Sequence, residues 1–195
     1  MKPGQKIVKL CNNMVEEVGE RAGLSRPVKR FLAQVVLGMT KSGSVRLSEI
    51  GRAGEQQHLK TVENRLSYHL NSPQWEDESL REAHLLWAAS TIRISQDTVL
   101  FFDISDIAKK YARAMEYLAN IYDHDEKRPA KGYWELNVEA INEKGREQRV
   151  LWEEIYSQLE PDFTGQNDRF FKAVRRVMKE GFLGWLARRG ERSPS

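Results

Sequence analysis

Apolar residues recur at three- and four-residue spacing through about the first ninety residues of the chain, which is the period of amphipathic helices. Gly23 and the run Ser42-Gly43-Ser44 interrupt this pattern, and Asn71-Ser72-Pro73 breaks it again. The spacing and the breaks predict five helices, at residues 5–22, 25–42, 47–52, 56–70 and 76–90. Ser25 is the expected N-cap of the second helix, with Pro27 in its first turn.

The third and fourth predicted helices are joined by a turn at Ala53-Gly54, which gives the outline of a helix-turn-helix. The fourth helix is expected to bury one apolar face and to direct its basic residues outward. The apolar face comprises Leu59, Val62, Leu66 and Leu70, and the outward residues are Lys60, Arg65 and His69. A plain helical bundle with a solvated basic face is the alternative interpretation.

After residue 97 the period changes from helical to extended. The compact apolar run Val99-Leu100-Phe101-Phe102 ends in Asp103, which predicts a buried strand with Asp103 near its end and facing an open cleft. Further segments are predicted as follows: helical or irregular at 106–121, strands at 132–140 and 148–156, and a helix at 168–179. The predicted fold class is therefore α+β, with three adjacent strands of one mixed or antiparallel sheet between residues 98 and 156.

Composition restricts the class of protein. With 195 residues, 40% of them hydrophobic, the chain is long and apolar enough to form a core. No apolar run reaches the ~20 residues of a membrane span, and no signal-type apolar segment follows the start. The single cysteine, Cys11, excludes an internal disulfide and suits a reducing compartment. These features predict a cytoplasmic protein without a membrane partner.

Charge is distributed unevenly. Residues 1–75 hold 12 Lys/Arg against 6 Asp/Glu, whereas residues 97–180 hold 14 against 17. A basic front and an acidic back suit a protein that binds phosphates at one end and a divalent metal at the other. Ordinary scatter of surface charge is the alternative explanation.

Asp103 is the most informative single residue. A charge at the end of a buried strand is costly unless something pairs with it, and Mg²⁺ is often held by only one or two carboxylates. Asp103 could be such a ligand, with Asp106 as the fallback. Equally, Asp103 could cap the following turn or pair with Lys109 or Lys110.

The segment around Asp103 resembles the first-aspartate motif of bacterial insertion-sequence transposases of the Asp-Asp-Glu type. In that family a strand ends in Asp-x-Ser/Thr and is followed by Asp-Ile-x-Lys and a Met-Glu pair. The corresponding residues here are Asp103-Ile104-Ser105, Asp106-Ile107-Ala108-Lys109 and Met115-Glu116. The likeness continues through Asp123 and Gly132-Tyr133 to Ala140. Upstream, residues 61–67 are similar to the helix before the catalytic domain, so the resemblance covers roughly residues 28–180.

The resemblance implies a ribonuclease H-like core in which three carboxylates hold two Mg²⁺ or Mn²⁺ ions for phosphodiester cleavage and strand transfer. Asp103 corresponds to the first catalytic, metal-binding aspartate. Strand alternation places only one of Asp103 and Asp106 on the active face.

The resemblance also implies a division of the chain. Residues 1–92 would form a helix-turn-helix-like DNA-binding region, 93–180 a partial ribonuclease H-like catalytic domain, and 181–195 an aberrant tail. Transposon-end DNA is the expected partner, with a full-length transposase or a second copy of the chain as further candidates. The expected DNA contacts are Lys60, Arg65, Lys109 and Lys110.

The sequence departs from the family near its end. The family follows this region with a strand close to Trp-Val-Ile-Asp-Arg-Gly, whereas Trp185–Gly190 places Arg188 at the second aspartate. The chain stops at Ser195, before a third carboxylate. We therefore expect a truncated transposase that binds metal weakly or not at all and does not cut DNA alone. The alternatives are a non-catalytic DNA-binding protein that occupies transposon ends and regulates transposition, and an unrelated helical regulator without such a sheet.

Overall fold

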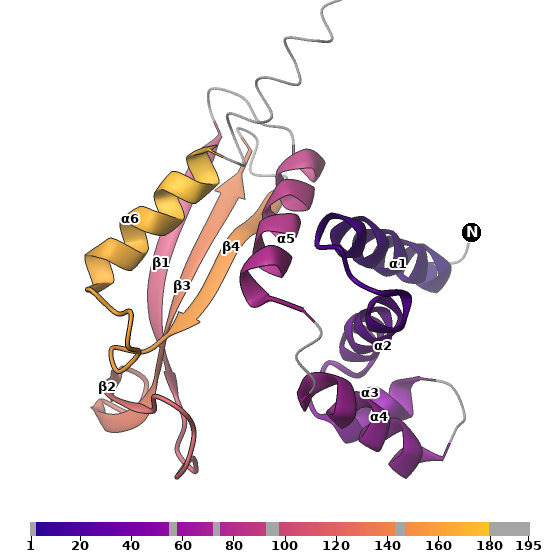
Figure 1. The fold of residues 1–195 in the computed structure, drawn as a ribbon, viewed down its shortest axis with the longest axis horizontal. Helices are drawn as coiled ribbons and strands as arrows, with labels where there is room; N and C mark the ends of the chain where they lie inside the picture. The colour runs from indigo at the N-terminus through magenta and orange to yellow at the C-terminus, as the bar shows by residue number, and fades with distance from the viewer. Residues whose placement is uncertain (1–2, 55–57, 72–74, 93–97, 143–146, 180–195) are drawn as a thin grey trace, which may run out of the picture. The chain divides into compact units, whose positions relative to one another are not determined.

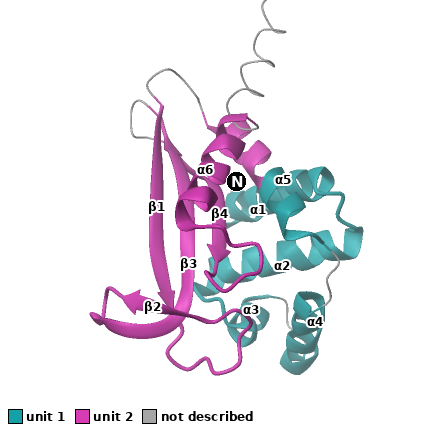
Figure 2. Cartoon of the chain, turned by 60° about the vertical axis from the view of Figure 1, so that its left-hand side comes forward, with its two compact units in different colours: residues 1–83 teal, residues 84–195 magenta. Residues whose placement is uncertain are grey.

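The computed structural model describes residues 3–54, 58–71, 75–92, 98–142 and 147–179. The chain divides into two compact units, residues 1–83 and 84–195 (Figure 2). The predictions for residues 181–195, Arg188 included, lie outside the described residues.

Unit 1 is helical, and its helices follow the predicted pattern closely. Their bounds are α1 Pro3–Arg21, α2 Arg26–Ser42, α3 Leu47–Ala53 and α4 Leu59–Asn71, and α5, Asp77–Thr91, runs from unit 1 into unit 2 (Figure 1). Helix α2 begins after Ser25 in extended conformation, has Pro27 in its first turn, and ends at Gly43, whose φ of 64° is left-handed. Pro fits the first turn because the amide it lacks has no helical partner there, and Gly tolerates positive φ because it has no Cβ.

The core of unit 1 is formed by α2, α3 and α4. Its buried residues are Phe31, Ile50, Val62 and Leu66. Helices α2 and α3 approach closely at Gly38, where a Cβ would lie 2.6 Å from Cγ2 of Ile50. Two details of α4 differ from the prediction: Leu70 is 53% exposed, and His69 stacks on Phe31 with ring centroids 5.0 Å apart. The aromatic ring of Phe31 therefore covers a position expected to face solvent.

Unit 2 contains an antiparallel sheet built on one long central strand. The strands are β1 Val99–Ala108, β2 Ala119–Asp123, β3 Arg128–Ile141 and β4 Gln148–Tyr156, followed by α6 Gln166–Arg176 (Figure 1). Strand β3 pairs with each of the other three. The α+β class and the three adjacent strands between residues 98 and 156 are thereby confirmed.

Helices α5 and α6 pack on one face of this sheet. The shared core comprises Leu85, Ala88, Ala89 and Ile92 of α5, Leu136, Val138 and Ala140 of β3, Leu151, Trp152 and Tyr156 of β4, and Ala173 and Val177. Leu100, Phe102 and Ile104 of β1 pack against it. Alternate residues of β1, including Phe101 and Asp103, consequently point to the other face.

Two predictions for this region were wrong. Strand β1 continues five residues beyond Asp103, so Asp103 lies in mid-strand rather than near the end. Residues 106–121, expected to be helical or irregular, include the last residues of β1 and the start of β2. The physical reason is pairing: residues 103–108 continue the ladder with β3 although their side chains are no longer uniformly apolar.

Among the described helices, none is long and apolar enough to cross a bilayer. Cys11 is a free, buried thiol.

Candidate nucleic-acid interface and carboxylate face

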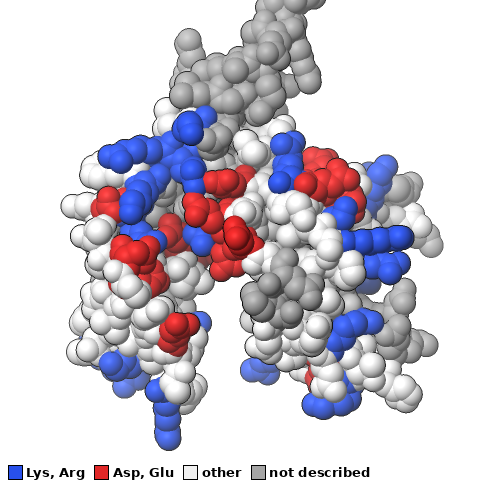
Figure 3. Space-filling view, viewed as in Figure 1, with Lys and Arg blue, Asp and Glu red and all other residues white. Residues whose placement is uncertain are grey.

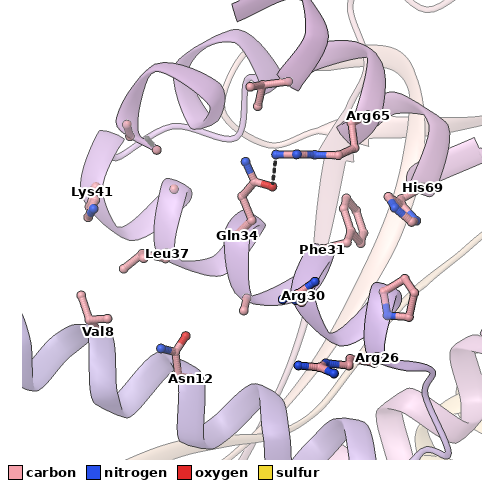
Figure 4. A pocket seen from close by; sticks show the side chains of 16 residues that line it. Val8, Asn12, Arg26, Arg30, Phe31, Gln34, Leu37, Lys41, Arg65 and His69 are labelled. Atoms are coloured by element: carbon pink, nitrogen blue, oxygen red, sulfur yellow. Dashed lines mark hydrogen bonds between the residues drawn. The ribbon is translucent and has the colours of Figure 1, made fainter. Parts of the chain in front are cut away.

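A groove in unit 1 runs between α1, α2 and α4 and reaches the end of α3 (Figure 4). Its volume is about 980 Å³. Val8 and Asn12 of α1 line one side, and residues of α4 line the other. Helix α2 forms the floor and supplies most of the lining, so the character of the groove is set by the α2 sequence.

Four cationic side chains line this groove: Arg26, Arg30, Lys41 and Arg65. None of its lining residues is Asp or Glu. Within the described part of the chain, none of the four cations forms an ion pair with a carboxylate. The groove is therefore a concentration of uncompensated positive charge, which attracts phosphate and other polyanions.

Arg65 is positioned rather than free. Its Nη2 donates a hydrogen bond of 2.9 Å to Oε1 of Gln34 across the groove (Figure 4). This bond uses one guanidinium donor and leaves the others available, since Arg carries five N–H groups in a planar fork. Next to it, His69 stacks on Phe31, and its Nδ1 is buried with no hydrogen-bond partner among the described residues.

The structure separates the two residues of α4 that the sequence grouped together. Arg65 lines the groove, whereas Lys60 does not. The Lys60 side chain is 82% exposed, and its Nζ lies 3.9 Å from Oε2 of Glu63, one turn along the same helix. The positive charge of Lys60 is thus partly offset by a neighbouring carboxylate.

Sequence reasoning missed Arg26, Arg30 and Lys41. Their signal was nevertheless present, because residues 26, 30, 34 and 41 recur at helical spacing and form a polar stripe on α2. The apolar stripe of the same helix is the stronger pattern in the sequence. The groove becomes visible only when this stripe is placed opposite α4.

In unit 2, Asp103 lies on the face of the sheet away from α5 and α6. It is exposed and stands opposite Asn137 of β3, which in turn stands opposite Glu153 of β4. Asp103 forms no ion pair within the described residues, and Lys110, one of its two suggested partners, pairs with Glu126 instead. Three polar residues thus cross the open face in one row.

Asp106 occupies a different environment. Its Oδ1 lies 2.6 Å from Nδ1 of His124, and the Asp106 side chain is only 13% exposed. Being three residues from Asp103, it projects from the opposite face of β1. The contact with His124 gives Asp106 a structural partner, so of the two aspartates Asp103 is the one open to a ligand.

The carboxylates of the open face influence one another. Partial burial raises the pKa of Glu153, and the negative charge of Glu135 on the neighbouring strand raises it further. A bound cation would relieve this repulsion. Such a raised pKa accompanies functional sites and structural ion clusters alike.

The fit of this face to the metal implied by the family is incomplete. Asp103 and the amide oxygen of Asn137 are hard ligands of the kind Mg²⁺ prefers. However, the described residues contain no group of three or more His, Cys, Asp or Glu side chains arranged to hold a metal ion. A two-metal centre needs more donors than Asp103 and its neighbours supply, and we derive no catalytic step through one.

Lys109 and Lys110 lie where β1 ends. The Lys109 backbone N–H donates to the carbonyl of Lys131 at 2.7 Å, which extends the pairing with β3. The Lys110 ammonium donates to Glu126, and this hydrogen bond, followed by the charge of Glu126, raises the pKa of Lys110. Neither lysine belongs to the groove of unit 1.

No protein-family model and no curated protein matches this chain.

Proposed function

We propose that this chain is a DNA-binding protein of the insertion-sequence transposase type. In this proposal the groove of unit 1 binds the phosphate backbone of transposon-end DNA, and Asp103 is the first carboxylate of a partial ribonuclease H-like domain. The observation that carries the proposal is the groove lined by Arg26, Arg30, Lys41 and Arg65 without a carboxylate.

Phosphate is the ligand that fits this groove best. Cations on neighbouring helices can each neutralise a phosphate, and every neutralised phosphate releases condensed counterions. The hydrogen bond from Arg65 to Gln34 fixes the direction of the Arg65 guanidinium before the ligand arrives, which lowers the entropic cost of binding. The adjacent α3 and α4 have the order of a helix-turn-helix, a motif that places its second helix in the major groove.

The sheet supports the transposase part of the proposal. Strands β1, β3 and β4 are paired antiparallel and are followed by α6, and Asp103 is exposed on β1. The sequence motif around Asp103 is similar to that of the family, but β1 runs five residues past Asp103, whereas the family's strand ends there. Mg²⁺ or Mn²⁺ is the cofactor that the family would use here.

The DNA-binding role is tested by the salt dependence of affinity. The full chain is titrated with labelled duplex DNA by fluorescence anisotropy at several salt concentrations. In the double variant Arg30→Ala/Arg65→Ala we expect weaker binding and a slope of log K against log salt that is shallower by about 0.9 for each phosphate that the variant no longer neutralises.

The control is Lys60→Ala, which removes one positive charge outside the groove and next to Glu63, against two in the double variant. It should change the slope by less than half as much as the double variant does. An unchanged slope in the double variant would remove the groove from the DNA interface.

The non-catalytic alternative is favoured by the incomplete donor set that the described residues place around Asp103. We therefore expect the purified chain, with Mg²⁺ or Mn²⁺ and DNA, to bind without nicking. Metal-dependent nicking that disappears in Asp103→Ala would contradict this expectation and support an active nuclease.

A further inference from the structure

The connection between β1 and β2 presents an unusually exposed aromatic ring. Tyr111 is 94% exposed, more than any other large hydrophobic side chain among the described residues. It lies in a tight turn in which the Ala112 N–H donates to the Lys109 carbonyl at 3.1 Å. A tyrosine ring left in water gains no stabilisation from burial, and its face is open for a ligand to stack on.

The loop that contains this turn is anchored at both ends. The Lys109 N–H pairs with the Lys131 carbonyl of β3 at 2.7 Å, and the Tyr133 hydroxyl donates to the Glu116 carbonyl. Both anchors are residues of the long central strand. Tyr111 therefore lies in a loop that is anchored to β3 at Lys109 and at Glu116, which lowers the entropy lost when a ligand binds.

Two cations flank Tyr111 in the chain, and the neighbouring segments also carry the carboxylates of Glu116 and Asp125. Lys109 and Arg113 form no ion pair within the described residues, and neither do Lys127 and Lys131 of the β2–β3 hairpin. Two more, Lys110 and Arg128, share the single carboxylate of Glu126. In Figure 3, Lys and Arg atoms project at the end of unit 2 where β2 lies in Figure 1.

A shallow hollow adjoins the ring. It has a volume of about 350 Å³ and is lined by residues 108–112, mostly through apolar atoms. An open hollow beside an exposed ring, edged by lysines, offers room for a flat group with a phosphate attached. A nucleotide with an unpaired base has this chemistry, because its base stacks and its phosphate is anionic.

We propose that the Tyr111 turn binds an unpaired base of single-stranded DNA. The base stacks on the Tyr111 ring, and Lys109 and Arg113 contact the flanking phosphates. A base inside a duplex is already stacked on its neighbours and cannot take this position without leaving the helix. The inference rests on the proposed function only in taking DNA as the ligand.

The test compares two labelled DNAs on the full chain: a duplex, and the same duplex carrying a short single-stranded tail. Wild-type protein should bind the tailed DNA more tightly. Tyr111→Leu should weaken binding to the tailed DNA at least about 5-fold, because the unpaired base loses the aromatic ring on which it stacks. Its affinity for the duplex should be unchanged. Tyr111→Phe, which keeps the ring, should behave as wild type.

Each other outcome has a distinct meaning. The inference is overturned if wild-type protein binds tailed DNA no more tightly than duplex. It is also overturned if Tyr111→Leu keeps the full preference for tailed DNA. The double variant Arg30→Ala/Arg65→Ala tests the groove separately. If it loses duplex affinity but still binds tailed DNA more tightly than duplex, both sites are supported independently. If wild-type protein fails to bind duplex but still binds the tail through Tyr111, the groove proposal fails and this one stands. Unchanged circular dichroism of Tyr111→Leu confirms folding.

Discussion

Gly132 shows how a single missing Cβ permits the sheet to form. It lies in β3 where Ala108 of β1 pairs on one side and Ala119 of β2 on the other. A Cβ at this position would lie 2.3 Å from the Ile107 carbonyl oxygen and 2.5 Å from Cδ1 of Ile121. The carbonyl cannot move away without breaking the pairing of β1 with β3.

We therefore expect Gly132→Ala to lower the free energy of unfolding by about 1–3 kcal/mol, the usual cost of overpacking. Chemical denaturation followed by circular dichroism measures it. Gly4→Ala is the control, because a Cβ there meets nothing within 4 Å. A Gly132→Ala protein as stable as wild type would mean that β1 and β3 are not paired at this point.

Glu153 gives the open sheet face a dependence on pH. Because its pKa is raised by partial burial and by Glu135, the folded protein holds the Glu153 proton more tightly than the unfolded chain does. Stability from this residue is therefore greatest in acid and is lost as the pH rises from the ordinary value of 4.5 through the folded pKa.

Glu153→Gln should accordingly stabilise the protein at about pH 7, by roughly 0.2–1 kcal/mol, as for other cross-strand charge pairs. At about pH 3.5, where Glu153 is protonated in both states, the substitution should have little effect. Glu135→Gln should give a smaller gain, since it leaves the burial of Glu153 unchanged. Urea midpoints measured at the two pH values test this expectation. A lower midpoint for Glu153→Gln than for wild type at neutral pH would refute it.

At the scale of elements, helices were predicted better than strands. Each predicted helix exists within a few residues, because helical spacing and the Gly and Pro breaks are local signals. Strand β1 was cut short at Asp103 because polar Asp103, Ser105 and Asp106 interrupt the apolar run, and the partner strand that continues the ladder is distant in sequence. Strand β2, with five residues, is too short for alternation to identify.

The candidate site shows the same difference between local and distant signals. Asp103 could be selected from a local motif, and the structure leaves it exposed on a sheet face. The groove could not be assembled from sequence, because Arg65 of α4 and the polar stripe of α2 meet only through the tertiary packing around Phe31 and Leu66. Spacing identifies a face of a helix, but not what lies opposite it.

Arg169 of helix α6 adds ion pairs to the apolar contacts that hold the helix on the sheet. Arg169 pairs with Glu154 of β4 at 2.8 Å, and with Glu160 at 2.7 Å and Asp162 at 3.1 Å in the preceding loop. The Arg169 and Glu154 side chains are only 13% and 11% exposed. Removing the cation would leave poorly solvated carboxylates close together, which costs more than the ion pairs themselves contribute.

We expect Arg169→Met to lower the free energy of unfolding by on the order of 2 kcal/mol, between the values for exposed and fully buried pairs. Lys172→Met is the matched control on the same helix, since its ion pair with Asp168 is well exposed and worth at most about 1 kcal/mol. Equal effects of the two substitutions in denaturant titrations would show that the Arg169 network is not structural.

At the scale of the whole molecule, the two units have separate cores. Phe31, Ile50, Val62 and Leu66 form one, and the cluster of α5, α6 and the sheet forms the other, with no residue in common. The boundary between the two compact units likewise falls after residue 83. Mutations in separate cores that share no partner are expected to act independently.

Two leucines allow a matched test of this independence. Leu66 and Leu136 are each 0% exposed, one in each core, so Leu66→Ala and Leu136→Ala remove the same atoms from equally buried positions. Each should cost about 2–5 kcal/mol of local stability, the range for truncating a buried leucine.

Hydrogen exchange measured segment by segment should be faster in α2–α4 for Leu66→Ala and in β1, β3 and β4 for Leu136→Ala, because local opening reports the core that holds each segment. DNA affinity should fall with Leu66→Ala, which loosens the groove, and remain near wild type with Leu136→Ala. If either substitution accelerates exchange equally throughout the chain, the units unfold as one and the DNA-binding groove depends on the sheet for its stability.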